Sequence, residues 1–162
     1  MRASWALPER EYQYFACDYA GRHGRVCSAR FVRNLRWCVM HKSWWDTVDA
    51  LAHSVGALVL AHPDLVSEMD KWVDDGNLWV ARVAILHQLA YKQHTDTGRL
   101  FDYCRRRADH PDFFIRKAIG WALREYSKTQ PEAVARYVAT MGDRLSPLSQ
   151  REALKRIKPL RT

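Results

Sequence analysis

The sequence predicts an all-α fold built as a solenoid of antiparallel helical hairpins. Two observations lead to this prediction: a short motif recurs at a fixed spacing, and the apolar residues between its copies follow helical rather than alternating periodicity. The chain has 162 residues, of which 48% are hydrophobic and 27% are charged. This composition is typical of a folded protein of one domain, so we expect a single domain over residues 1–162.

Each copy of the repeated motif starts with a large apolar residue. Arg or Val follows three positions later, Ala five positions later, and Leu or Ile six positions later. Its copies start at Trp45, Trp79 and Phe113, with a weaker copy at Leu148. A spacing of 34 residues predicts stacked helical hairpins that cover one another's apolar faces. Tetratricopeptide repeats have this period, but their Gly and Tyr are missing here, so HEAT-like pairs fit better.

The expected helices follow in order from residues that favour the first turn of a helix. Residues 8–19 and 28–41 supply one helix pair before the first motif. Ser43 is expected to cap the next helix, with Asp46 at its third position. Later starts are expected at Pro63, Asn77, Pro111, Pro131 and Pro147.

The net charge of +8 favours a polyanionic partner, because positive charge in excess attracts nucleic acid or anionic membrane surfaces. An acidic central segment, residues 44–98, lies between two basic stretches. No apolar run approaches the ~20 residues of a membrane span, and no signal peptide is visible, so we expect a cytoplasmic protein without a membrane partner. The Cys and His spacings fit no metal site, and we expect no metal and no cofactor.

One candidate site lies on the helix of the first motif. Trp45, Asp49 and His53 are spaced to share one face. A different face carries the expected apolar stripe of Trp44, Val48, Leu51 and Val55. A Trp and a carboxylate one turn apart on a non-core face are a plausible site, although a solvated surface carboxylate explains Asp49 as well.

A second candidate site lies on the helix of the third motif, where Lys117, Trp121 and Arg124 share one face. An aromatic ring between two cations suits a phosphate backbone with an exposed base or sugar. Arg82 and Arg116 take the same motif position and are interpreted either as braces between helices or as ligands. The C-terminal tail offers further cations for phosphates: Arg151, Lys155, Arg156, Lys158 and Arg161.

The sequence resembles the DNA alkylation repair enzymes of the AlkD-like DNA glycosylase family. The resemblance runs from about Leu35 to Ile157, and four segments carry it in the family's order: Lys42–Asp49, Trp79–Ala84, Phe113–Tyr126 and Leu145–Lys155. It implies a HEAT-like α-solenoid with a basic concave face that grips duplex DNA. It also implies excision of N3- and N7-alkylated purines in base excision repair, without a cofactor.

The resemblance also assigns roles to residues. The catalytic carboxylate falls on Asp49, and the active-site tryptophans fall on Trp45 and Trp121. In this interpretation Asp49 stabilises the oxocarbenium-like sugar and positions water, while Arg82 anchors a phosphate. Further DNA contacts are expected from Arg116, Lys117, Arg124, Arg151 and Lys155. The expected partner is duplex DNA containing alkylated bases, bound by a monomer.

Chains of this family carry further helix pairs before the Trp-Trp-Asp motif, so we expect the N-terminal repeats to be missing here. An aromatic cluster near the N-terminus is then expected to form an interface: Trp5, Tyr12, Tyr14 and Phe15. Two alternatives to the glycosylase stay open. One is a DNA-binding solenoid without catalysis, and the other is a protein-interaction scaffold, because a fold does not fix a function.

Overall fold

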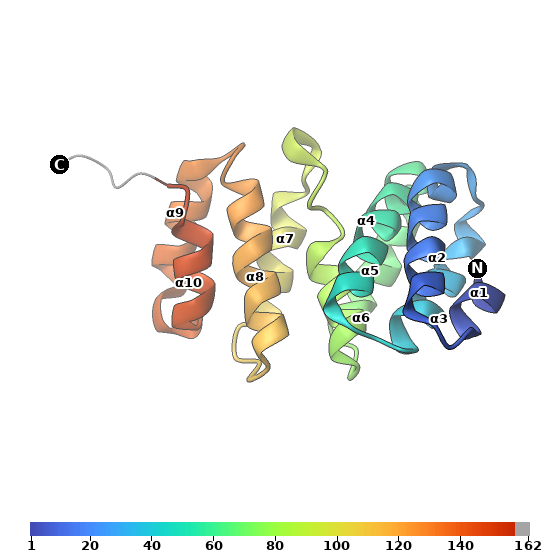
Figure 1. Ribbon diagram of the computed structural model, residues 1–162. Coiled ribbons are helices and arrows are strands. Elements are labelled where there is room, and N and C mark those ends of the chain that lie inside the picture. Colours follow the sequence, from blue (N-terminus) through green and yellow to red (C-terminus); the bar gives the residue numbers. More distant parts are fainter. Residues whose placement is uncertain (158–162) are drawn as a thin grey trace. The chain divides into compact units, whose positions relative to one another are not determined.

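A computed structural model describes residues 1–157, and in this part of the chain it contains ten α-helices and no strand (Figure 1). The prediction of an all-α fold is therefore confirmed. The chain divides into two compact units, Met1–His87 and Gln88–Thr162, and each is described by itself. None of the described helices is long and apolar enough to cross a membrane.

The first unit is organised around α4 (Trp45–Ala61), which packs against α2, α3 and α6. Leu51, Val55 and Leu58 of α4 are fully buried. The other helices of this unit are α1 (Arg2–Ala6), α2 (Arg10–His23), α3 (Val32–Met40), α5 (Val66–Trp72) and α6 (Leu78–Leu86), with 3-10 turns at Gly24–Val26, Ala29–Phe31 and Pro63–Leu65.

The second unit is organised around α8 (Phe113–Tyr126), which packs most extensively against α10 (Pro147–Leu154). Its other helices are α7 (Thr97–Arg106) and α9 (Pro131–Met141), with 3-10 turns at Lys92–His94 and Gly142–Arg144. Gly120 makes the approach of α10 possible, because a Cβ there would lie 2.6 Å from the Cβ of Glu152 and 3.0 Å from the Ser149 carbonyl oxygen. This close approach brings Glu152 against α8.

Three of the expected helix starts, those at Asn77, Pro131 and Pro147, are confirmed, whereas α8 starts at Phe113 after the cap residue Asp112 rather than at Pro111. The side chain of Asn77 caps α6 by accepting hydrogen bonds from the amides of Trp79 and Val80, and Pro131 and Pro147 are the first residues of α9 and α10. Pro63 instead begins a 3-10 turn. The short helix α1 was not predicted, since five residues show no periodicity. The start of α7 was also missed, although Asp96 caps it.

Two expectations about the start of α4 are wrong. Trp44, not Ser43, is the N-cap residue, and it is 49% exposed rather than part of the buried stripe. The reason is that the Ser43 hydroxyl donates backwards to the Val39 carbonyl at the end of α3, at 2.6 Å. Trp44 then enters α4 with an extended backbone, which makes Asp46 the second residue of the helix.

Trp5 also differs from its expectation as part of an N-terminal interface. Its side chain is only 1% exposed, and its indole nitrogen donates to the His41 carbonyl at 2.8 Å. Trp5 is therefore a core residue of the first unit. Tyr12, Tyr14 and Phe15 are exposed, as expected of residues available for an interface.

Candidate active site

Asp49 and Arg82 form an ion pair between α4 and α6. Arg82 Nε donates to Asp49 Oδ1 at 2.8 Å, and Arg82 Nη2 donates to Asp49 Oδ2 at 2.9 Å. The arginine side chain is 5% exposed and the aspartate side chain 14%. Two parallel hydrogen bonds in a nearly dry environment fix the plane of the carboxylate. Both residues were predicted from the sequence as site residues, but their pairing with each other was not predicted.

Trp45 lies on the same helix as Asp49 and is exposed to solvent. It is the first residue of α4, one turn before Asp49, and it is 48% exposed. Its neighbour Trp44 is equally exposed and lies near Trp79 of α6, with 6.1 Å between the ring centroids. Aromatic surface left open to water beside a buried carboxylate is suited to packing against a sugar or a base.

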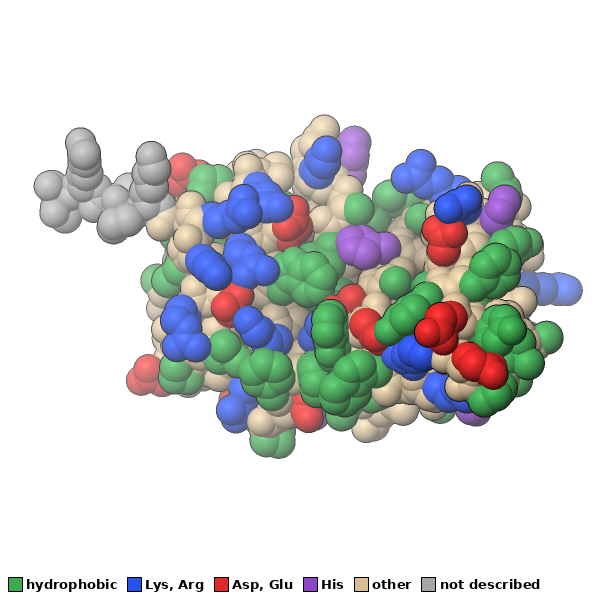
Figure 2. All heavy atoms as spheres, viewed as in Figure 1, with side chains coloured by type: hydrophobic (Ala, Val, Ile, Leu, Met, Phe, Trp, Pro, Cys, Tyr) green, Lys and Arg blue, Asp and Glu red, His purple; other side chains and the backbone are tan. Residues whose placement is uncertain are grey.

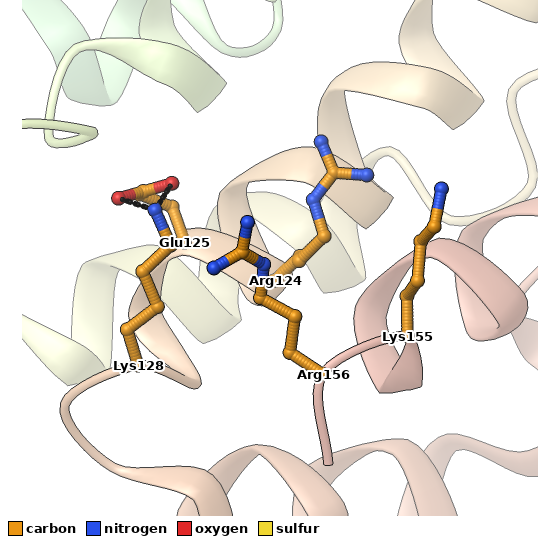
Figure 3. Close-up of a pocket in the computed structure, with 5 residues that line it drawn as sticks. All are labelled: Arg124, Glu125, Lys128, Lys155 and Arg156. Atoms are coloured by element: carbon orange, nitrogen blue, oxygen red, sulfur yellow. Dashed lines mark hydrogen bonds and ion pairs between the residues drawn. The ribbon is translucent and has the colours of Figure 1, made fainter.

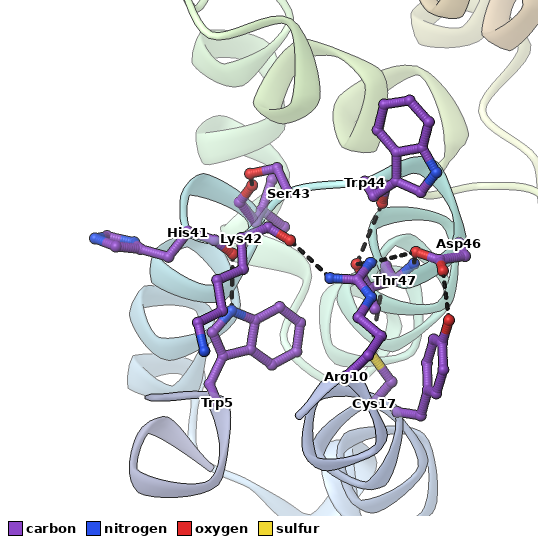
Figure 4. A network of polar contacts seen from close by, with 11 residues as sticks. Trp5, Arg10, Cys17, His41, Lys42, Ser43, Trp44, Asp46 and Thr47 are labelled. Atoms are coloured by element: carbon purple, nitrogen blue, oxygen red, sulfur yellow. Dashed lines mark hydrogen bonds and ion pairs between the residues drawn. The ribbon is translucent and has the colours of Figure 1, made fainter. Parts of the chain in front are cut away.

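A polar network holds the first turn of α4 against α2 (Figure 4). The Arg10 guanidinium pairs with the Asp46 carboxylate and donates to the Thr47 hydroxyl at 3.1 Å. The Tyr14 hydroxyl donates to the other Asp46 oxygen at 2.8 Å. Burial raises the pKa of Asp46, but hydrogen bonds from Tyr14 and Arg10 outweigh it and hold that pKa below its ordinary value. This network was not predicted from the sequence, because Arg10 and Tyr14 each lie more than 30 positions from Asp46.

The loop before α4 belongs to the same network. Lys42 has a φ of 52°, a left-handed conformation that is costly for a residue with a Cβ. The Lys42 carbonyl accepts a hydrogen bond from Arg10 at 2.9 Å, and the Lys42 ammonium donates to the Ala6 carbonyl at 3.1 Å. Contacts from α1 and α2 therefore stabilise the strained residue that leads into Trp44 and Trp45.

In the second unit, Lys117 and Arg124 share one face of α8 as predicted, and both pair with Glu152 of α10. The Lys117 ammonium lies 3.2 Å from Glu152 Oε1, and Arg124 contacts Oε2. Burial raises the pKa of Glu152, but the two cations outweigh it and lower that pKa below its ordinary value. Trp121, on the same helix between the two cations, is half-buried.

The remaining predicted cations of the second unit have different surroundings. Arg116 is half-buried, and its Nε donates to the His110 carbonyl at 3.0 Å, so it braces the start of α8. Arg151 and Lys155 are exposed on and just after α10. Lys158 and Arg161 lie outside the described residues.

A cavity of about 510 Å³ opens at the end of α8 (Figure 3). It is lined by Arg124, Glu125, Lys128, Lys155 and Arg156. Glu125 is bound by Lys128, with both carboxylate oxygens 2.6 Å from the ammonium, so the remaining lining is cationic. Figure 2 shows that Lys and Arg side chains gather over α8 and α10 on one face of this unit. The arrangement suits phosphate groups.

No group of three or more His, Cys, Asp or Glu side chains within residues 1–157 is placed to hold a metal ion. A fixed carboxylate beside an exposed indole can stabilise a cation and orient water, as hydrolysis at a sugar carbon requires.

Comparison with known proteins found matches to this chain. The model of the DNA alkylation repair enzyme family matches residues 1–157. A solved structure of a predicted DNA alkylation repair enzyme from Enterococcus faecalis is 36% identical, with a TM-score of 0.90, over 98% of this chain and 74% of that chain. A search of curated proteins found no match. The chain belongs to the DNA alkylation repair enzyme family, which gives it a role in the repair of alkylated DNA and makes DNA its partner.

Proposed function

We propose that this protein is a DNA glycosylase that excises N3- and N7-alkylated purines from duplex DNA. The observation that carries the proposal is the pair of Asp49 and Arg82 beside the exposed ring of Trp45, in a chain of the DNA alkylation repair enzyme family. A duplex that carries one alkylated purine is the expected substrate, and no cofactor takes part.

Alkylation at N3 or N7 gives the purine a positive charge and makes it a good leaving group. The bond between the base nitrogen and C1′ breaks, and its electron pair leaves with the base, which becomes neutral. The deoxyribose then carries oxocarbenium-like positive charge. Water attacks C1′, loses a proton, and leaves an abasic site and a free base.

Asp49 has the geometry for both parts of this reaction. Each of its carboxylate oxygens accepts one hydrogen bond from Arg82, and a carboxylate oxygen has a second lone pair. These lone pairs stabilise the cationic sugar and orient the attacking water. Because Arg82 fixes the carboxylate before the reaction, little reorganisation is needed when charge develops.

The aromatic and basic residues hold the DNA. In this proposal Trp45 packs against the sugar next to the lesion, where its ring also attracts the developing positive charge. Trp121 of the second unit supplies a further aromatic contact to the DNA. Arg82 was expected to anchor a phosphate, but it is buried in its pair with Asp49 and orients that carboxylate instead. Additional phosphates are bound by the basic residues of the second unit, namely Arg116, Lys117, Arg124, Arg151 and Lys155.

The test is release of free base from duplex DNA that contains 7-methylguanine. Wild-type protein is expected to release 7-methylguanine and leave abasic sites, whereas the Asp49→Asn variant binds the same duplex and releases little base. Unmodified duplex is the control substrate. Salt-sensitive DNA binding without base release by the wild-type protein would identify a DNA-binding protein without catalysis. Absence of both would favour a protein-interaction scaffold.

A further inference from the structure

Glu152 of α10 is an acidic residue among the cations of the second unit. Its Oε1 lies 3.2 Å from the Lys117 ammonium, and Arg124 pairs with its Oε2. Burial raises the pKa of Glu152, but Lys117, Arg124 and Lys155 outweigh it and hold that pKa below its ordinary value. The Glu152 side chain is 12% exposed, whereas those of Lys117 and Arg124 are 39% and 23% exposed. A nearly buried anion therefore contacts cations that reach the solvent.

The packing of α10 on α8 holds this carboxylate in place. A Cβ at Gly120 would lie 2.6 Å from the Cβ of Glu152, so the backbone of α10 at Glu152 lies directly against α8. Lys117 and Arg124 are seven residues apart, which is about two turns of α8, and each pairs with one oxygen of Glu152. The carboxylate is fixed by the two cations, and it orients them in return.

Lys117 and Arg124 can bind a phosphate without leaving Glu152. An ammonium has three N–H donors and a guanidinium has five, so one carboxylate does not use them all. Arg124 also lines, with three other cations, the cavity of about 510 Å³ at the end of α8 (Figure 3). A phosphate in this cavity would be attracted by Arg124 and repelled by the Glu152 carboxylate, because Glu152 pairs with the same guanidinium.

We propose that Glu152 limits the affinity of this protein for duplex DNA by competing with backbone phosphates for Lys117 and Arg124. Together the three side chains carry a net charge of +1, whereas the two cations alone would carry +2. The carboxylate keeps both cations in position, and its charge opposes each phosphate that they bind. The inference rests on the DNA contacts proposed for Lys117 and Arg124, and it does not depend on base excision.

A purely structural role for Glu152 predicts the opposite effect on DNA binding. If Glu152 only held α10 against α8, its removal would loosen the helices that present Lys117 and Arg124, and DNA binding would weaken. If Glu152 competes with phosphates, removal of its charge strengthens DNA binding. The direction of the change in affinity therefore separates the two roles.

The test is binding of an undamaged duplex, measured by fluorescence anisotropy at several salt concentrations. Glu152→Gln removes the charge but keeps the length of the side chain and an oxygen that accepts hydrogen bonds. We expect it to bind about three- to tenfold more tightly at low salt, as one charge interaction near contact distance would give. The slope of log affinity against log salt should become steeper by up to about 0.9. Weaker or unchanged binding by folded Glu152→Gln protein would overturn the proposal.

Glu132→Gln on α9 is the matched control for net charge, because Glu132 is exposed and the variant also loses one negative charge. It is expected to change the affinity much less than Glu152→Gln does. Equal strengthening in both variants would assign the effect to total charge and overturn the proposal. Circular dichroism establishes that each variant is folded. Glu152→Met removes the same charge and is expected to strengthen binding as well, which gives the same test on a second variant.

Lys117→Gln tests whether Glu152 acts through its cations. This variant is expected to weaken DNA binding, and the gain from Glu152→Gln should shrink when the two substitutions are combined. An undiminished gain, or DNA binding unaffected by Lys117→Gln, would overturn the proposal. A protein that binds DNA as expected but releases no 7-methylguanine would contradict the glycosylase proposal and support this one.

Discussion

Two carboxylates take equivalent positions in the two units of the molecule. Asp49 follows the motif residue Trp45 by four positions, and Glu152 follows Leu148 by four. Their side chains are similarly buried, with 14% and 12% exposure, and both are paired with cations of another helix. The position of an acidic residue in the repeat therefore does not distinguish the proposed catalytic group from a structural one.

The partners of the two carboxylates differ. Asp49 has both oxygens bound by Arg82, which is 5% exposed, and Trp45 beside it is open to solvent. The two carboxylate oxygens of Glu152 pair with different cations, Lys117 and Arg124, whose side chains are 39% and 23% exposed. The pair in the first unit is dry and rigid beside an accessible ring, whereas the pairs in the second unit brace α8 against α10.

The largest difference in the free energy of unfolding is expected between two variants, each of which breaks one ion pair in one unit. Arg82→Met leaves the Asp49 carboxylate without its buried partner and is expected to lower the free energy of unfolding by about 3–5 kcal/mol. Lys117→Met removes a partner that is more than a third exposed and screened by water, and should cost about 0–1 kcal/mol. Urea unfolding measures both. Equal losses would show that the two pairs do not differ as described.

The second prediction concerns the packing that places Glu152. Gly120→Ala puts a methyl group 2.6 Å from the Cβ of Glu152 and is expected to cost about 1–3 kcal/mol, because α8 and α10 must separate. Gly21→Ala on α2 is the control, since its added Cβ meets nothing within 4 Å. It should be neutral or slightly stabilising. Thermal unfolding of both variants tests this, and an unaffected Gly120→Ala protein would contradict it.

A smaller effect is expected on the salt dependence of DNA binding. Lys155→Gln should weaken binding a few-fold and reduce the slope of log affinity against log salt by about 0.9, as expected for one lost phosphate contact. Arg136→Gln on α9 is the matched control, because Arg136 is also exposed and does not line the cationic cavity at the end of α8. Fluorescence anisotropy at several salt concentrations measures the slopes. Identical changes in both variants would argue against a defined phosphate surface at α10.

The smallest effect is the pH dependence of stability that comes from Glu152. Its pKa is lowered because Lys117 and Arg124 outweigh the effect of burial. The stabilisation is therefore present above the unfolded pKa of about 4.3 and is lost as pH falls through the lower folded value. Glu152→Gln should show a flatter loss of stability in that acidic range. Parallel profiles for the variant and the wild type would contradict the assignment.

Helical spacing was enough to predict which face of α4 carries Trp45 and Asp49, because positions four apart on a helix are neighbours whatever packs around them. The all-α fold and the starts of α6, α9 and α10 followed from the repeated motif and from Asn and Pro. The family followed from segments whose side chains are specific to it. The match to the family model runs over residues 1–157, so it extends further toward the N-terminus than the resemblance from about Leu35.

The pairing of side chains depends on tertiary packing and did not follow from spacing. Asp49 and Arg82 are 33 residues apart, and only the packing of α4 on α6 brings them together. Glu152 was missed, although its place in the repeat equals that of Asp49. The cap of α4 was wrong because the hydrogen bond from Ser43 to Val39 competes with capping, and a local pattern cannot decide between the two.

The most direct test of the catalytic role of Asp49 is the single-turnover rate of 7-methylguanine release at protein concentrations that saturate the DNA. Asp49→Asn, Glu152→Gln and the wild type are compared on the same duplex. We predict that Asp49→Asn lowers the rate by about 10²–10³-fold, the range for loss of one electrostatic group that stabilises a transition state, whereas Glu152→Gln leaves it nearly unchanged. Equal rates for Asp49→Asn and the wild type would contradict the account.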